Sequence, residues 1–217
     1  MQALKDAWAA WKAALGVIWQ NLVQVIALNL LWLVTAFPIV TAGPATLAAY
    51  WWGARVLRDE REVGYPIYFK AFKRFFLKGL VWFVGWVVVL YLAYLNLQVW
   101  GILLPPMGAA VVQMVWYYAL LFLAAMQPYL LEALTVDEEP WGQALKQSAW
   151  QVVANPTYSH VHLVIPALLV YVASRYATVS AVVLTAMILL FWTVVAEKVP
   201  WKYGAPPPTR RNIEDVL

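Results

Sequence analysis

Four or five long apolar runs, each nearly free of charge, constrain this chain more than any other feature. Hydrophobic residues make up 64% of the 217 residues and charged residues only 12%, whereas soluble domains average roughly half and about a quarter. A single soluble core could not bury this much apolar surface. Runs of about twenty apolar residues are long enough to cross the hydrocarbon core of a bilayer. The sequence therefore predicts an all-α, polytopic membrane protein.

Helical periodicity and breaker residues divide the chain into spanning and interfacial segments. The first amphipathic helix is expected to run straight into the first span, which ends near Pro38, and Pro128 is expected to interrupt the third span. We treat 1–197 as one membrane domain and 198–217 as a polar, extended or disordered cytoplasmic tail. The five transmembrane helices are expected at about 17–37, 80–103, 109–131, 158–174 and 178–196, and the interfacial helices at about 3–15, 44–57, 66–78 and 140–154.

The distribution of Lys and Arg predicts the orientation, because cytoplasmic loops carry an excess of these residues. Of the fifteen Lys and Arg residues, twelve fall on one side of the five-span topology and three on the other. The minority side holds Lys5, Lys12 and Arg175. We therefore expect a multi-pass protein of the bacterial cytoplasmic membrane, with the N-terminus outside and the C-terminus in the cytoplasm.

Catalytic signatures are missing from the sequence. It contains no GxxxxGK[ST], GxGxxG, HExxH or GxSxG motif and no cysteine, so we expect no enzyme, no cofactor and no metal site. An intramembrane enzyme is a remote alternative whose only candidate groups are Glu132, His160 and His162. The two histidines lie about 200° apart on a helix and could not share a metal there.

Four amides in the first expected span stand out in an apolar segment. Amides at this depth should face protein or water rather than lipid. Hydrogen bonds between helices are the favoured interpretation, and a polar cavity is the alternative. The residues concerned are Gln20, Asn21, Gln24 and Asn29.

The most patterned segment is 66–78, in which basic and aromatic residues occupy different faces of a predicted helix. Near-surface Lys and Arg attract anionic lipid by about 1 kcal/mol each. We expect anionic-lipid binding by Lys70, Lys73, Arg74 and Lys78 in a helix lying in the interface. A role limited to setting the topology is the alternative, and no nucleic-acid partner is expected because the bilayer requires the aromatic residues.

A tight break is predicted at 38–46, between the first span and the next helix. Pro38 cannot donate a helical hydrogen bond, Gly43 permits a positive φ, and Pro44 suits a helix start. Freed backbone groups must find partners, because lipid offers none. The available side chains are those of Thr35, Thr41 and Thr46, or the amides of a neighbouring span. The break is thus the expected functional surface. Proline breaks followed by acidic loops in both halves also suggest an internal repeat, and its origin by duplication is left open.

Residues 29–50, NLLWLVTAFPIVTAGPATLAAY, carry a family resemblance, as do FKRFF at 72–76 and the helix ending in AsnPro at 147–156. The chain resembles the YesL-like family of uncharacterised bacterial membrane proteins over about 1–197. The resemblance assigns no catalytic role to its motif residues. These are Asn29, Trp32, Pro38, Gly43, Pro44, Ala45 and Thr46.

The resemblance implies an association with oligosaccharide uptake, because genes of this family often accompany those of sugar ABC importers. We therefore expect a non-enzymatic accessory protein that binds another membrane complex, in particular a carbohydrate ABC importer. The alternative is a small passive transporter or lipid-handling protein that uses the amides of the first span and the GlyPro break as a cavity. The sequence leaves the partner, any substrate and the oligomeric state undetermined.

Overall fold

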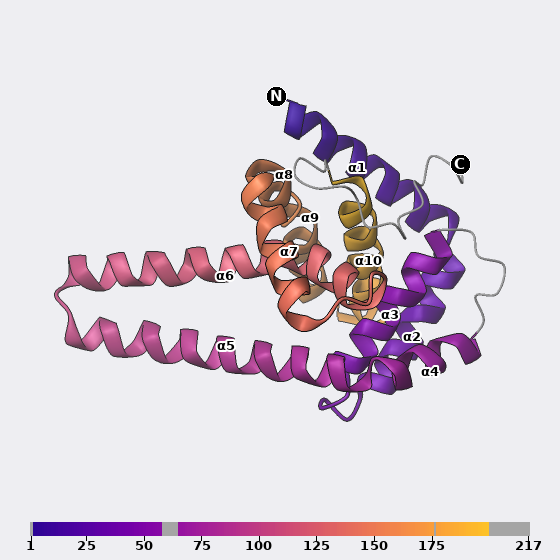
Figure 1. Ribbon diagram of the computed structural model, residues 1–217, viewed down its shortest axis with the longest axis horizontal. Helices are drawn as coiled ribbons and strands as arrows, with labels where there is room; N and C mark the ends of the chain where they lie inside the picture. Colours follow the sequence, from indigo (N-terminus) through magenta and orange to yellow (C-terminus); the bar gives the residue numbers. More distant parts are fainter. Residues whose placement is uncertain (1, 58–64, 176, 200–217) are drawn as a thin grey trace.

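The computed structural model describes residues 2–57, 65–175 and 177–199, and this part of the chain is helical with no strand (Figure 1). The predicted all-α fold class is therefore confirmed. Residues 58–64, which hold the acidic loop of the first half, and nearly all of the tail at 198–217 lie outside the described residues. The helices are α1 (Gln2–Gln20), α2 (Leu22–Ala36), α3 (Ala42–Leu57), α4 (Tyr65–Arg74), α5 (Phe76–Leu103), α6 (Pro106–Thr135), α7 (Trp141–Ala154), α8 (Pro156–Val161), α9 (Val164–Arg175) and α10 (Ala177–Lys198).

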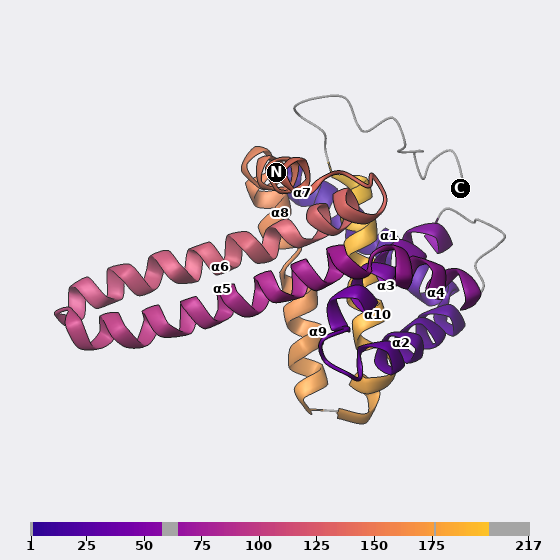
Figure 2. The same cartoon turned by 60° about the horizontal axis from the view of Figure 1, so that its bottom comes forward.

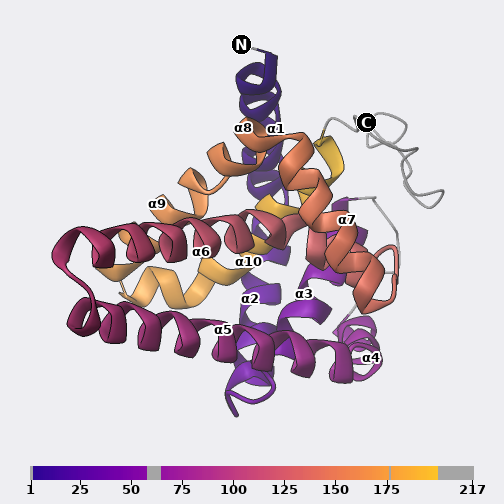
Figure 3. The ribbon, with the colours of Figure 1, turned by 60° about the vertical axis from the view of Figure 1, so that its left-hand side comes forward.

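A long hairpin of α5 and α6 extends away from the rest of the molecule, and all three ribbon views show it (Figures 1, 2 and 3). The two helices have 28 and 30 residues, so each is about 42–45 Å long. α6 continues through Pro128 without a break, and the expected interruption of the third span at this proline is wrong. A proline inside such a helix is tolerated where neighbouring groups satisfy the freed backbone.

Three helical segments are long and apolar enough to cross a membrane among the described residues, or four if one bent pair counts as a span. They are Phe76–Leu103, Pro106–Thr135 and Pro156–Arg175, and the bent pair is α1 with α2. The chain is therefore a multi-pass, all-α membrane protein by the length and composition of its helices. Within Pro156–Arg175, a turn at His162 and Leu163 separates α8 from α9.

The expected straight continuation from the first amphipathic helix into the first span is wrong. α1 and α2 meet at an angle of 85°, at Asn21, whose φ of −114° and ψ of 29° are not helical. The Asn21 side chain donates a hydrogen bond to the carbonyl oxygen of Val17 at 2.9 Å, and such local bonds compete with the helical pattern. α2 is left with 15 residues, about 22 Å, which is shorter than the hydrocarbon core of a typical bilayer.

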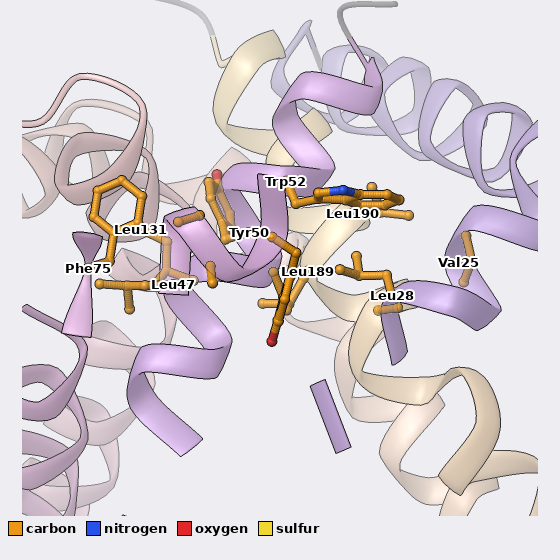
Figure 4. Packing of buried hydrophobic residues seen from close by; sticks show 14 of the residues in the cluster. Val25, Leu28, Leu47, Tyr50, Trp52, Phe75, Leu131, Leu189 and Leu190 are labelled. Carbon is orange, nitrogen blue, oxygen red and sulfur yellow. The ribbon is translucent and has the colours of Figure 1, made fainter. Parts of the chain in front are cut away.

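The central element of the fold is α3, which was expected to be an interfacial helix at 44–57. All residues from Gly43 to Tyr50 are buried, and protein rather than lipid headgroups surrounds them. Figure 4 shows Leu47, Tyr50 and Trp52 of α3 between side chains of the other helices. The sequence signal was misleading because small apolar residues such as those of α3 suit both a buried helix and an interfacial one. Other core residues of this cluster are Val25, Leu28, Phe75, Leu131, Leu189 and Leu190.

A second core joins α1 to the C-terminal end of α10 and to α8. α1 buries an alanine face, Ala7, Ala10 and Ala14, against a cluster that includes Tyr158, Val195 and Val199. The opposite face of α1 keeps Lys5, Trp8 and Lys12 exposed, and the predicted helix at 3–15 corresponds to α1. The predicted helix at 140–154 corresponds to α7.

Candidate functional site

The predicted break between the first span and the next helix is confirmed. The helix ends at Ala36 and begins again at Ala42, and short backbone bonds close the turn, including Ile39 N–H to Ala36 O at 2.8 Å and Ala42 N–H to Ile39 O at 2.9 Å. The residue with positive φ is Ile39, at 60°, and not Gly43, which lies inside α3. A β-branched residue in this region is strained. The turn must therefore be held by its surroundings.

Threonine hydroxyls supply that support, as the sequence predicted. Thr41 Oγ1 donates to the carbonyl oxygen of Thr35 at 2.6 Å, across the break. Thr46 Oγ1 donates to Ala42 O at 2.8 Å and accepts from Trp32 Nε1 at 3.0 Å. Two of the family-motif residues, Trp32 and Thr46, therefore join α2 to α3 directly.

Tyr68 of α4 extends this network to a third helix. Its hydroxyl lies 2.7 Å from Thr35 Oγ1 and donates to Ala45 O at 3.4 Å. The side chain is fully buried. Burial raises the pKa of Tyr68 to about 12, and the hydrogen bond to Thr35 opposes that rise. The ring therefore remains a neutral phenol at physiological pH.

Gly43 and Gly79 form the closest approach of two helices around the break. A Cβ added to Gly43 would overlap the carbonyl oxygen of Gly79 and lie 2.7 Å from Cβ of Phe83. A Cβ added to Gly79 would overlap the backbone of Pro44. The function of Gly43 is thus to let α3 and α5 touch, rather than to adopt an unusual backbone conformation.

The four basic residues of 66–78 do not form one continuous interfacial stripe. The predicted helix divides at Phe75, between α4 and α5. Lys70 and Lys73 are exposed on α4, whereas Arg74 forms an ion pair with Glu138. Lys78 Nζ donates to three backbone carbonyls, Leu134 O at 3.1 Å, Glu138 O at 3.3 Å and Glu139 O at 3.2 Å. Two of the four cations therefore anchor the connection between α6 and α7.

An apolar cavity of about 270 Å³ lies between α5, α6 and α7, where the hairpin joins the body. Aliphatic side chains and three indole rings, those of Trp82, Trp86 and Trp141, form most of its lining. Gln127 is the one amide among them. The other lining residues are Val81, Gly85, Val89, Leu123, Leu130 and Leu145.

Gln127 fixes two of these indoles in place. Its Oε1 accepts hydrogen bonds from Trp82 Nε1 at 3.0 Å and from Trp86 Nε1 at 3.1 Å. Its Nε2 donates to Leu123 O at 2.8 Å. Both lone pairs of the amide oxygen are thereby used inside the protein. The cavity consequently presents rigid apolar walls rather than polar groups.

The four amides proposed to line a polar cavity do not come together. Gln20 and Gln24 are exposed, and the Asn21 side chain donates a hydrogen bond to the carbonyl oxygen of Val17 in α1. Asn29 alone is buried, and its Oδ1 accepts a hydrogen bond from the backbone N–H of Ala186 in α10 at 3.1 Å. The 85° bend at Asn21 separates residues that one straight helix would have aligned. For Asn29, the contact is the expected hydrogen bond between helices.

The groups considered for an intramembrane enzyme are also dispersed among separate contacts. Glu132 Oε2 accepts a hydrogen bond from the buried Tyr50 hydroxyl at 3.1 Å. His162 Nδ1 lies 2.9 Å from Trp11 Nε1, which donates to it, and His160 Nδ1 lies 2.7 Å from Pro156 O. Within the described ranges, no three of His, Asp and Glu gather as ligands for a metal ion.

Comparison with protein families identifies the segment that contains the break. Residues 25–97 match the family described as "Protein of unknown function, DUF624". Over this segment the chain is similar to the DUF624 family. This is the YesL-like group, so the resemblance seen in the sequence is confirmed, over about a third of the chain rather than over 1–197. Comparisons with curated proteins and with solved structures gave no match.

The matched segment spans most of α2, all of α3 and α4 and most of α5, and therefore contains the motif residues, the Gly43–Gly79 contact and the four cations. Sequence reasoning missed Gly79, Tyr68 and Gln127. A glycine at the start of an apolar span and a lone amide beside Pro128 were the available signals. Neither one indicates which helix it contacts.

Proposed function

We propose that this protein is a non-enzymatic accessory membrane protein that associates with another membrane complex, and that this partner is a carbohydrate ABC importer. The α5–α6 hairpin carries the proposal. Only 6% and 17% of the residues in the most apolar stretches of the two helices are buried. Apolar side chains remain exposed along both helices, among them Val88, Tyr91, Met114 and Tyr117. Such a surface can pack against the spanning helices of a partner.

The importer as partner class comes from the family resemblance, and the hairpin supplies a surface for it. Association through van der Waals packing needs long, accessible helix faces. Both helices of the hairpin extend away from the rest of the molecule (Figure 2). A partner can therefore approach them without displacing the packed helices α1, α3 and α10.

The cytoplasmic membrane of a bacterium is the proposed location, with both termini in the cytoplasm. The packing of α1 supports this revision of the expected outside N-terminus. Ala7, Ala10 and Ala14 lie against the C-terminal end of α10, which supports a position of α1 on the same side of the membrane as that end. Lys5 and Lys12 then join the cytoplasmic cations, which leaves Arg175 as the one basic residue outside and strengthens the Lys and Arg asymmetry.

Site-specific photo-crosslinking in native membranes tests the accessory role. A photoreactive residue at Tyr91 or Tyr117 of the hairpin should capture one membrane protein, which mass spectrometry identifies, whereas the same residue at the exposed Trp19 of α1 should not. Recovery of an importer subunit supports the full proposal. Capture of lipid alone from both hairpin positions would overturn it.

A lipid-handling role is the second candidate, and the apolar cavity at the base of the hairpin favours it. Passive transport of a polar solute through the first-span amides has no such support, because Gln20 and Gln24 are exposed while Asn29 is held against α10.

A further inference from the structure

We propose that the cavity between α5, α6 and α7 binds one acyl chain of an anionic phospholipid. This inference deepens the lipid-handling candidate and does not depend on any association with an importer. The cavity lies at the base of α5 and α6, and the outer faces of these two helices are apolar and exposed. Its natural surroundings are therefore the hydrocarbon region of the bilayer, from which a chain can enter sideways.

The lining selects hydrocarbon over a polar ligand. Trp82, Trp86 and Trp141 provide large flat apolar surfaces, and the aliphatic lining residues complete the walls. Gln127 directs its amide oxygen to the two indole N–H groups and its nitrogen to Leu123 O. A sugar would lose its hydrogen bonds to water here without gaining enough partners, which makes its burial unfavourable. An acyl chain has no such requirement.

The position of the cavity along α5 indicates where the lipid headgroup lies and which charge it carries. Lys78 lies one helical turn before the lining residues Val81 and Trp82, on the same face of the helix. At 1.5 Å per residue, the lined stretch from Val81 to Val89 begins about 4–5 Å beyond Lys78 and continues for about 12 Å. A chain lying in the cavity therefore places its headgroup near the start of α5. Lys70 and Lys73, exposed on the preceding helix α4, come eight and five residues before Lys78 in the chain, and their charge favours a phosphate or other anionic headgroup.

Gly85 offers a direct way to fill the cavity. It lines the space, and no atom lies within 4 Å of the position that a Cβ would take. Gly85→Leu should place a branched side chain in this volume, and its Cβ meets no neighbouring atom. Gly142→Leu is the matched control, because Gly142 also has nothing within 4 Å of an added Cβ and does not line the cavity. Val89→Phe is a second filling variant from the same wall.

The experiment is native mass spectrometry of the full chain after reconstitution in nanodiscs of mixed phosphatidylglycerol and phosphatidylcholine, followed by delipidation in detergent. The unmodified protein and Gly142→Leu should retain phosphatidylglycerol. Gly85→Leu should retain at least fivefold less, and Val89→Phe should repeat that loss. Phospholipids with brominated acyl chains should also quench less tryptophan fluorescence in Gly85→Leu than in Gly142→Leu.

Equal retention by Gly85→Leu and Gly142→Leu would overturn the cavity proposal, as would retention of phosphatidylcholine and phosphatidylglycerol in equal amounts. If Gly85→Leu does not fold, the same comparison is made with Val89→Phe. Lipid loss in a filling variant whose hairpin still crosslinks to a membrane partner would separate the two ideas. The cavity proposal would then stand whatever the accessory role proves to be.

Discussion

The backbones of Gly43 and Gly79 touch where α3 crosses α5, and neither residue has room for a side chain. This contact lies within the family segment: Gly43 follows the break after α2, and Gly79 lies in the first turn of the hairpin helix α5. It therefore couples the turn at 37–41 to the direction in which the hairpin leaves the body.

Gly43→Val should destabilise the protein more than Gly53→Val. At Gly43 the obstacle is the backbone of α5, so the helices must separate, and overpacking of this kind costs about 1–3 kcal/mol or more. At Gly53 an added Cβ meets the flexible end of Leu190, at 2.9 Å, which can rotate away. Thermal unfolding in detergent measures the difference. Similar midpoints for the two variants would contradict the importance of the backbone contact.

Lys78→Gln should destabilise the fold, because Lys78 holds three carbonyl oxygens at the end of α6. Hydrogen bonds from a charged donor contribute about 1.5–3 kcal/mol. The exposed Lys73→Gln is the control and should change stability by less than about 0.5 kcal/mol. Denaturation of both variants in the same nanodiscs makes the comparison. An unchanged midpoint for Lys78→Gln would show that the loop between α6 and α7 does not depend on this cation.

Lys70→Gln together with Lys73→Gln should weaken the preference for anionic lipid without lowering stability. Each near-surface cation contributes about 1 kcal/mol, so the pair contributes about 2 kcal/mol at most. Native mass spectrometry of lipid exchange in mixed nanodiscs measures the preference. Lys78→Gln, whose Nζ binds carbonyl oxygens, serves as the comparison. If Lys78→Gln abolishes the preference and the double variant keeps it, the assignment of these cations is wrong.

Tyr68 should make the fold sensitive to alkaline pH. Its pKa is raised to about 12 in the folded chain by burial, above the value of about 10 expected in the unfolded chain. The stabilisation is fully present below about pH 10 and is lost as the pH rises through 12, by an amount on the order of 2 kcal/mol. The difference in stability between the unmodified protein and Tyr68→Phe, measured from pH 8 to 12, isolates the effect. A difference that does not change with pH would exclude it.

Single cysteines test the orientation, since the chain contains none of its own. In intact cells, a membrane-impermeant thiol reagent should label Arg175→Cys and should not label Lys5→Cys or Lys73→Cys. After the cells are opened, all three should react. Labelling of Lys5→Cys from outside would restore the orientation inferred from five spans and would be incompatible with α1 packed on the C-terminal end of α10.

Much of the local chemistry could be read from the sequence. Pro38 and the threonines predicted a break and the side chains that support it, because proline removes a donor wherever it occurs and threonine bonds to nearby carbonyls. The reason given for Gly43 was wrong. A glycine allows either a positive φ or a close contact, and the identity of the partner, Gly79, depends on how two helices cross.

The amides of the first span illustrate the same limit. Their spacing placed them on neighbouring faces of one helix, which holds only if the helix is straight. The bend at Asn21 sends Gln20 to the surface and Asn29 into the core. Likewise, the sequence placed Lys70 and Lys78 on one basic stripe of a single helix. The helix divides at Phe75, so Lys70 is exposed to solvent, whereas Lys78 binds the end of α6.

The sequence by itself determined that the chain is helical, that it belongs in a membrane and that it breaks between α2 and α3, because these properties depend on composition and on residues close together in the chain. Tertiary structure alone decided that α3 is central, that α1 folds back onto α10, and that Gln127 holds Trp82 and Trp86 beside an apolar cavity. Those outcomes depend on contacts between residues far apart in the sequence, and the hydrophobic pattern does not encode which apolar faces meet, because the hydrophobic effect has no direction.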